Sequence, residues 1–289
     1  MFAIALEQQQ YKTYILSDAS SSSQLEVVPE RGGIITRWRV QGQEILYLDE
    51  ERFEDPQLSV RGGIPILFPI CGNLPENTYT YKGQQYKLKQ HGFARDLPWR
   101  AVGCVYEQGV SLQADLHTNE QTLAVYPFDF QLVLTYQIKG NSLIIYQHYT
   151  NKSSEPMPFS SGFHPYFLTH DKTQLEFEIP SREYQNQKTG EVQPFNGTFD
   201  FNQDEIDVAF KQLSGNSATV IDHSCRLKLT LEYDDIYSTL VFWTLKGKDF
   251  YCLEPWSAPR NALNTGENLT VLEPGASCSV TVRLTANFF

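Results

Sequence analysis

Hydrophobic and polar residues alternate along most of this chain, which is the pattern of β-strands that bury one face. The segment 130–138 shows the pattern most clearly, because every second residue from Phe130 to Ile138 is apolar. The polar sequence Lys139-Gly140-Asn141-Ser142 then predicts a turn, and residues 143–150 predict the returning strand of a hairpin. This part of the chain is therefore predicted to be antiparallel β-structure.

Similar short strands are predicted along the rest of the chain, separated by glycine and proline. No periodic repeat, Pro/Ser-rich linker or abrupt change in composition is present, so residues 1–289 are predicted to form one large antiparallel β domain. The alternation in the middle of the chain is predicted to begin at Val102. Outside the hairpin, strands are predicted at 13–16, 25–28, 34–40, 79–81, 85–88, 227–233, 239–245, 269–272 and 278–284.

Two regions depart from this pattern. Residues 61–73 are apolar but rich in glycine and proline, so their backbone is predicted to form neither a long helix nor a central strand. An apolar loop of this kind needs a structural or functional reason. Residues 184–210 are polar and irregular, and we expect a long surface excursion there.

Composition narrows the possible partners and the compartment. The 23 basic and 34 acidic residues give a net charge of −11, which argues against nucleic acid and anionic membranes as partners. The five cysteines are scattered, so neither a disulfide framework nor a zinc site is predicted. The N-terminus lacks the basic start of a signal peptide, and no apolar run is long enough to span a membrane. We expect a soluble, cytoplasmic protein.

Two similar stretches contain the best candidates for acid–base chemistry. His164 lies among aromatic residues in Ser160–Phe167, and Glu254 lies among apolar residues in Tyr251–Trp256; a proline follows each of them. An imidazole gives and takes protons near neutral pH, and burial raises the pKa of a carboxyl group toward that range. Each residue also has a structural interpretation: a core histidine bonded to backbone, or a buried carboxylate paired with an arginine.

Four further polar residues are candidates for substrate binding, and each has a structural alternative. His91 either caps a turn or donates a hydrogen bond to a substrate hydroxyl. Arg61 and Arg95 either bridge loops or bind hydroxyls, a carboxylate or a phosphate. Asp207 is an acidic residue in an acidic loop, where solvation is the usual role. The aromatic residues that belong either to the core or to the wall of a sugar site are Phe68, Phe93, Tyr166 and Trp256.

Other chemistries have little support in the sequence. The phosphate-binding and dinucleotide-binding glycine motifs, the zinc-protease motif and the nucleophile-elbow motif are all absent. Three histidines, His91, His148 and His164, are possible metal ligands, but their neighbours do not have the spacing of a metal site. We therefore expect no metal.

Five stretches, taken together and in order, resemble the aldose 1-epimerase (galactose mutarotase-like) family along nearly the whole chain. Each is short, but five in the same order at plausible separations are specific. They are Arg61–Pro65 with Phe68-Pro69 and Gly72-Asn73, His91–Arg95 with Trp99, Gly162–Phe167, Glu254–Trp256, and Leu272–Gly275.

The resemblance implies a large antiparallel β-sandwich with a sugar site in a concave face, and neither a metal nor an organic cofactor. By motif match, His164 corresponds to the family's general acid, Glu254 to its general base, and His91 to a second histidine that contacts the sugar. Asp207 resembles the substrate-binding aspartate. Many members have Asn-Arg after the first glycine loop, whereas this chain has Gly72–Pro75, so the role of that arginine passes to Arg61 or Arg95.

The implied activity is the interconversion of the α and β anomers of a hexose, with the substrate left open. Arg61 and Arg95, with Lys87 and Lys89 nearby in sequence, would gather the phosphate of a hexose 6-phosphate; otherwise the substrate is a free aldose. A non-catalytic carbohydrate-binding protein on the same fold is the alternative. Glycoside hydrolysis is a third possibility, with Asp207 as the second carboxylate that this reaction requires.

Overall fold

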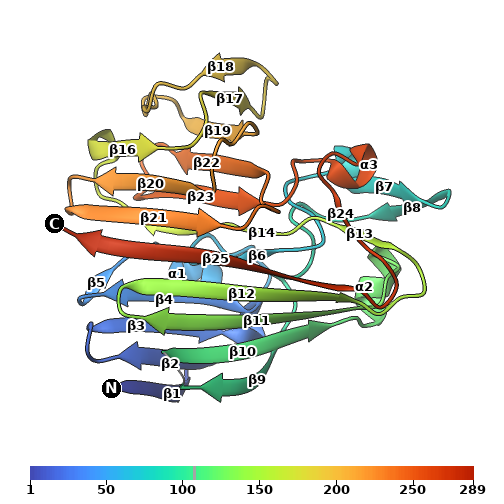
Figure 1. Ribbon diagram of the computed structural model, residues 1–289, viewed down its shortest axis with the longest axis horizontal. Coiled ribbons are helices and arrows are strands. Elements are labelled where there is room, and N and C mark those ends of the chain that lie inside the picture. The colour runs from blue at the N-terminus through green and yellow to red at the C-terminus, as the bar shows by residue number, and fades with distance from the viewer. Residues whose placement is uncertain (107–108) are drawn as a thin grey trace.

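The computed structural model describes residues 1–106 and 109–289, which form an all-β fold of layered antiparallel sheets (Figure 1). The first layer, which we call the outer sheet, has eight described strands, with the long strand β25 near its middle. Its strands, in spatial order, are β16 (Leu175–Glu178), β20 (Ser217–Asp222), β21 (Leu227–Tyr233), β25 (Ser277–Phe288), β12 (Ser142–Asn151), β11 (Phe130–Lys139), β10 (Val110–His117) and β9 (Arg100–Val105).

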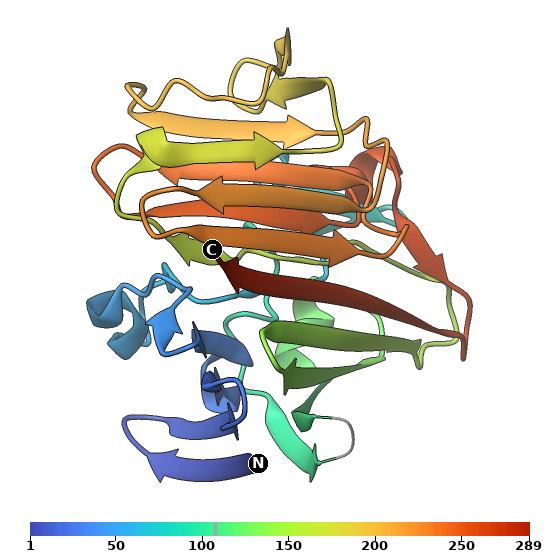
Figure 2. The same cartoon turned by 60° about the vertical axis from the view of Figure 1, so that its left-hand side comes forward.

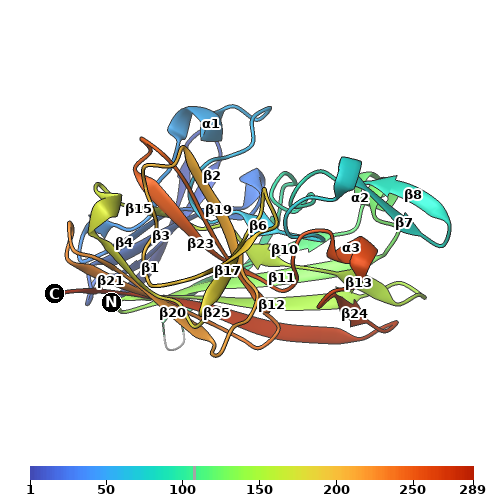
Figure 3. The same cartoon turned by 90° about the horizontal axis from the view of Figure 1, so that it is seen from above.

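The second layer, which we call the pocket sheet, lies against the outer sheet, as the view from above shows (Figure 3). Short strands extend it at one end, where β14 and β15 both pair with β23. Its strands are β18 (Val192–Pro194), β17 (Glu183–Asn186), β19 (Glu205–Phe210), β22 (Thr239–Leu245), β23 (Phe250–Trp256), β14 (Gly162–Phe163) and β6 (Ile66–Leu67), with β15 (Tyr166–Leu168) beside β23.

An N-terminal sheet and small elements complete the fold. Figure 2 shows the N-terminal sheet next to the end of the outer sheet that contains β9 and β10. Its strands are β1 (Phe2–Gln8), β2 (Lys12–Asp18), β3 (Ser23–Val28), β4 (Ile34–Val40) and β5 (Gln43–Glu44). The remaining elements are the ribbons β7 (Thr78–Tyr81) with β8 (Gln84–Lys87) and β13 (Met157–Phe159) with β24 (Thr270–Leu272), the helices α1 (Glu50–Glu54), α2 (Glu120–Val125) and α3 (Ala262–Thr265), and 3₁₀ turns at Pro29–Arg31, Pro75–Asn77 and Lys172–Gln174.

The pocket sheet buries a different set of side chains on each face. Because side chains alternate along a strand, Ile206, Val208 and Phe242 point to the core between the layers. Their neighbours Asp207 and Trp243 point to the opposite face, where loops cover the sheet. Every residue of β23 is buried, because the core covers one of its faces and the residues of a pocket cover the other.

The structure confirms the predicted fold class and most of the predicted strands. The region 184–210, however, is only partly the irregular excursion that we expected, because β17, β18 and β19 add three strands to the pocket sheet within it. Strand β1 was not predicted, and residues 107 and 108, within the alternation predicted from Val102, lie outside the described residues. Among the described residues, the helices are too short to cross a membrane.

Gly162 of β14 pairs with Trp256 of β23 in the pocket sheet, and the space beside it is too small for a side chain. A Cβ atom built on Gly162 would lie 2.5 Å from the carbonyl oxygen of Pro255 in the paired strand. The backbone of Gly162 does not have a positive φ, so space rather than backbone conformation requires glycine here. The absence of a side chain at Gly162 allows β14 to lie directly against β23.

We predict that Gly162→Ala lowers the free energy of unfolding by about 1–3 kcal/mol, because the added methyl group forces the two strands apart. Gly103→Ala in β9 is the matched control, since Gly103 also lacks a positive φ and a Cβ there would meet nothing within 4 Å. Denaturant unfolding of both variants tests the prediction. Equal stabilities of the two variants would contradict it.

Candidate active site

Strand pairing brings the two predicted acid–base residues together. Gly162 of β14 faces Trp256, and Tyr166 of β15 faces Cys252, both on β23. His164 is halfway between Gly162 and Tyr166, and Glu254 is halfway between Cys252 and Trp256. Directly opposed residues in an antiparallel pair have their Cβ atoms about 4.5–5.5 Å apart. The register alone therefore places the imidazole and the carboxyl group side by side.

The two side chains are in direct contact and are shielded from solvent. The Nε2 atom of His164 lies 3.2 Å from Oε1 of Glu254. His164 is 8% exposed and Glu254 is 1% exposed. The indole N–H of Trp256 donates to Oε2 of Glu254 at 3.0 Å, and the ring of Tyr166 stacks on the imidazole at a centroid distance of 4.7 Å. These contacts fix the orientation of both groups.

Burial changes the proton affinity of both members of the pair. It raises the pKa of Glu254 well above its ordinary value, and the hydrogen bond from Trp256 only partly opposes this effect. Burial, assisted by the positive charge of Arg95, lowers the pKa of His164 to about 3. Both effects disfavour charge, so burial favours one proton shared between the two facing atoms over two separate charges.

His91 approaches the pair from a tight turn. It has a φ of +66°, and Gly92, which follows it, has a φ of +70°. Its Nδ1 accepts a hydrogen bond from the backbone N–H of Gly72 at 3.1 Å, so the neutral ring has its proton on Nε2. Burial, together with the nearby Arg95, His164 and Arg260, lowers the pKa of His91 well below its ordinary value. Its ring centroid is 5.5 Å from that of His164.

These three residues line one pocket of about 380 Å³, which we call the central pocket. This volume is in the range of small-molecule sites. The walls combine aromatic rings with a high density of charged groups. The lining residues are Arg52, Ser59, Val60, Arg61, Gln90, His91, Arg95, His164, Tyr166, Glu205, Asp207, Val241, Trp243, Glu254, Trp256 and Arg260.

The arginines of the central pocket fall into two groups. Arg260 is neutralised, because its Nη2 lies 2.7 Å from Oδ2 of Asp207. Among the described residues, Arg52, Arg61 and Arg95 have no carboxylate partner. Arg52 and Arg95 donate only to backbone carbonyl groups, of Ser59 and Gln90 respectively. The pocket therefore has uncompensated positive charge as well as an acid–base pair.

Three residues of this pocket have a buried polar side-chain atom without a hydrogen-bond partner among the described residues. In the part of the chain that the structure describes, nine buried side-chain nitrogen and oxygen atoms lack a hydrogen-bond partner. Three of them belong to residues of the central pocket: Nδ1 of His164, Nε of Arg95 and Nε of Arg260. Buried polar groups are normally paired, so unpaired ones grouped in one pocket indicate a polar ligand.

All six residues that the sequence analysis singled out line the central pocket: His91, His164, Glu254, Arg61, Arg95 and Asp207. The expectation that Lys87 and Lys89 lie with the arginines is wrong, because both line a neighbouring pocket on the other side of the 88–97 loop.

Sequence reasoning missed several residues of the pocket. Arg52 lies in α1 and Arg260 follows a proline, and neither has a sequence signal that marks it. The sequence positions of Glu205 and Trp243 mark them as pocket residues only once the strand pairing around Asp207 is known. Glu205 is two residues from Asp207, and the structure pairs Trp243 directly with Asp207, so both share its face of the sheet.

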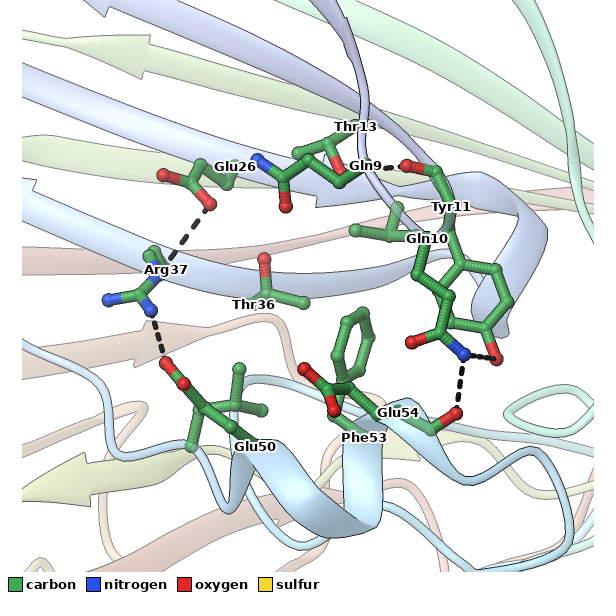
Figure 4. A pocket seen from close by; sticks show the side chains of 12 residues that line it. Gln9, Gln10, Tyr11, Thr13, Glu26, Thr36, Arg37, Glu50, Phe53 and Glu54 are labelled. Carbon is green, nitrogen blue, oxygen red and sulfur yellow. Dashed lines mark hydrogen bonds and ion pairs between the residues drawn. The ribbon is translucent and has the colours of Figure 1, made fainter.

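Two other pockets lack the pairing of a histidine with a carboxyl group that the central pocket has. The pocket of about 450 Å³ beside α2 has a mainly apolar wall that includes Leu88, Phe93 and Leu97. A pocket of about 200 Å³ beside α1 is polar, and Figure 4 shows Arg37 between Glu26 and Glu50, with which it forms ion pairs. None of the described residues that line either pocket is a histidine or a cysteine.

Cys252 lies close to the acid–base pair. Its Sγ and one ligand atom each of His164 and Glu254 are within 4.8 Å of one another, a spacing that a metal ion would accept. Burial, with the nearby charge of Glu254, raises the pKa of the Cys252 thiol well above its ordinary value. Cys252 is fully buried in an apolar cluster with Tyr166 and Phe250 and is not among the residues that line the central pocket.

Comparison with known proteins identifies the family of the chain. The family model described as Aldose 1-epimerase matches residues 17–285. Protein LacX of Lactococcus lactis is 26% identical over 236 residues, covering 72% of this chain and 78% of that protein. A protein of Cenchrus ciliaris named putative glucose-6-phosphate 1-epimerase is 26% identical over 233 residues, covering 75% of this chain and 67% of its own length.

Solved structures agree with this result. The Slr1438 protein of Synechocystis sp. PCC 6803 superimposes with a TM-score of 0.95 at 48% identity, with all of both chains covered. A galactose mutarotase-like protein of Clostridium acetobutylicum has a TM-score of 0.84 at 20% identity, covering 100% of this chain and 99% of that one, and so shares the fold. The family model extends over nearly the whole chain, and the chain therefore belongs to the aldose 1-epimerase family.

Proposed function

We propose that this protein is an aldose 1-epimerase that interconverts the α and β anomers of a hexose. The observation that carries the proposal is the contact of 3.2 Å between His164 and Glu254 inside a pocket of sugar size. Opening a pyranose ring requires one proton to leave the anomeric hydroxyl and another to reach the ring oxygen. A pair that holds one proton between a base and an acid supplies both transfers.

In the proposed mechanism, Glu254 removes the proton of the anomeric hydroxyl while His164 gives a proton to the ring oxygen. The C1–O5 bond breaks, the hydroxyl oxygen becomes an aldehyde, and the C1–C2 bond rotates. Reclosure with reversed proton roles delivers the other anomer, and the pair again holds one proton. Each positioned acid or base contributes roughly 10²–10⁴-fold to the rate.

The surroundings favour this chemistry in three ways. Burial raises the pKa of Glu254, which makes its carboxylate a stronger base, and lowers the pKa of His164, which makes its protonated ring a stronger acid. His91, neutral and with its proton on Nε2, is a hydrogen-bond donor for a sugar hydroxyl. Trp256 holds the carboxyl group in place throughout, because its indole can only donate.

The uncompensated arginines favour a phosphorylated substrate over a free aldose. Arg52, Arg61 and Arg95 bring three positive charges to the central pocket. A planar guanidinium group matches the geometry of a phosphate and can bind two of its oxygens at once, through two parallel hydrogen bonds. We therefore propose a hexose 6-phosphate as the preferred substrate. Free glucose or galactose would bind the same acid–base pair more weakly.

We predict that Glu254→Gln retains the fold and most sugar binding but loses mutarotation by roughly 10²–10⁴-fold, because the amide cannot accept the hydroxyl proton. Polarimetry of freshly dissolved α-glucose 6-phosphate measures the rate, after subtraction of the spontaneous reaction. Full activity in this variant would rule out Glu254 as the base. Circular dichroism confirms that the variant is folded.

The pH dependence of the rate provides a separate prediction. A second proton inactivates the pair by occupying both groups, and the pKa of His164 is lowered to about 3. As the pH falls, kcat/KM should therefore stay constant down to pH 4.5, the ordinary pKa of a glutamate, and should decline only at lower pH. His164→Asn should have no such acid limb. A decline centred at pH 4.5 or above in the wild type would contradict the assignment.

Arg61→Gln is predicted to raise KM for glucose 6-phosphate by roughly 10- to 150-fold and to leave KM for glucose within about twofold, since a lost charge-assisted bond is worth about 1.5–3 kcal/mol. Arg182→Gln, an exposed arginine outside the pocket, is the control. Initial rates with both sugars at one ionic strength give the comparison. Equal changes in the two KM values would argue for a free aldose as the substrate.

A further inference from the structure

The tip of the β17–β18 hairpin touches the wall of the central pocket. This hairpin belongs to the polar region 184–210 and adds two short strands at the edge of the pocket sheet. The backbone N–H of Gln187 donates to the carbonyl oxygen of Asp207 at 2.9 Å, which extends the β17–β19 pairing to the tip. The two residues Gln187 and Lys188 therefore lie next to two acidic residues of the pocket, Asp207 and Glu205.

The turn itself fixes the position of these two residues. The side-chain oxygen of Asn186 accepts the backbone N–H groups of Lys188 at 2.9 Å and Thr189 at 3.1 Å. The N–H of Gly190, which has a φ of +76°, donates to the carbonyl oxygen of Asn186 at 2.8 Å. Asparagine turns of this kind define the backbone locally. These hydrogen bonds within the turn set the position of the hairpin tip.

Asp207 is held by one donor on each carboxylate oxygen. The side-chain amide of Gln187 donates to Oδ1 at 2.8 Å, and Arg260 donates to Oδ2 at 2.7 Å. A carboxylate accepts about four hydrogen bonds, so each oxygen retains capacity for a further donor. The side chain is 10% exposed and lines the pocket, so a ligand group in the pocket can supply that donor.

Glu205 is held in the same manner. The indole N–H of Trp243 donates to Oε1 at 2.7 Å, and the ammonium group of Lys188 pairs with Oε2. Burial would raise the pKa of Glu205, but the hydrogen bonds from Lys188 and Trp243 outweigh that effect and lower it. Glu205 is therefore an ionised acceptor with a compensated charge. Trp243 also contacts the ring of His164 edge-on, at a centroid distance of 5.6 Å.

We infer that the β17–β18 hairpin is a specificity element, in which Gln187 and Lys188 are positioning residues that hold Asp207 and Glu205 as acceptors for sugar hydroxyl groups. This inference rests on the proposed function. The acceptors on β19 take the neutral, hydroxylated part of the substrate, and the unpaired arginines take its anionic group. Lys188 cancels the charge of Glu205, which would otherwise repel an anionic substrate.

Gln187→Leu tests the inference, with Gln185→Leu as the matched control. Gln185 belongs to the same hairpin, but its amide donates to the carbonyl oxygen of Gly190 instead of reaching the pocket. We expect Gln187→Leu to raise KM for both glucose and glucose 6-phosphate by about tenfold, the size of one hydrogen bond to a charged group, with kcat within about twofold. Gln187→Asn, which retains an amide, should fall between that variant and the wild type.

A second variant tests the charge of the hairpin. Lys188→Met should raise KM for glucose 6-phosphate by about twofold to threefold relative to glucose, and added salt should reduce the difference, because exposed ion pairs contribute little and are screened. A purely structural role of the lysine would shift both KM values equally.

The possible outcomes separate the two proposals. A wild-type protein that accelerates the mutarotation of neither sugar overturns the proposed function, and the inference with it. An active wild type in which Gln187→Leu and Gln185→Leu have the same KM overturns the role of the hairpin alone. A fall in kcat at unchanged KM in Gln187→Leu also overturns it, since a positioning residue for hydroxyl binding acts on KM.

Discussion

The antiparallel register between residues 162–168 and β23 is the constraint on which the rest of the site depends. It opposes His164 to Glu254, and the pleat then turns both side chains toward the same face. A shift of one residue would send one of them into the core. Glycine at position 162 allows the close approach of the strands, so packing within the sheet and proton transfer between the two side chains depend on the same geometry.

Burial gives this geometry its chemical consequence. Away from water, neither the imidazolium nor the carboxylate is well stabilised, so the two groups share one proton in place of two separate charges. The positive charges that remain belong to arginines around the rim of the pair. The central pocket therefore combines a buried imidazole–carboxyl pair with arginines that lack a carboxylate partner among the described residues and, on β19, two carboxylates.

The sequence predicted the fold class and six residues that line the central pocket because local signals report them. Period-two alternation identified the long hairpin of β11 and β12, and proline after an enclosed ionisable residue pointed to His164 and Glu254. Arg260 and Gln187 escaped prediction because their roles depend on contacts with Asp207, which lies 53 and 20 residues away in the chain. Lys87 and Lys89 were misplaced because nearness in sequence did not reveal that their loop has two faces.

The proposal that one shared proton drives the exchange of sugar anomers is tested most directly by magnetisation transfer between the α and β anomeric protons. The experiment uses glucose 6-phosphate and glucose, each with the wild-type protein. The account predicts an exchange rate that rises in proportion to protein concentration, with the larger increase for glucose 6-phosphate. An exchange rate equal to that of the buffer for both sugars, at protein concentrations that bind them, would contradict it.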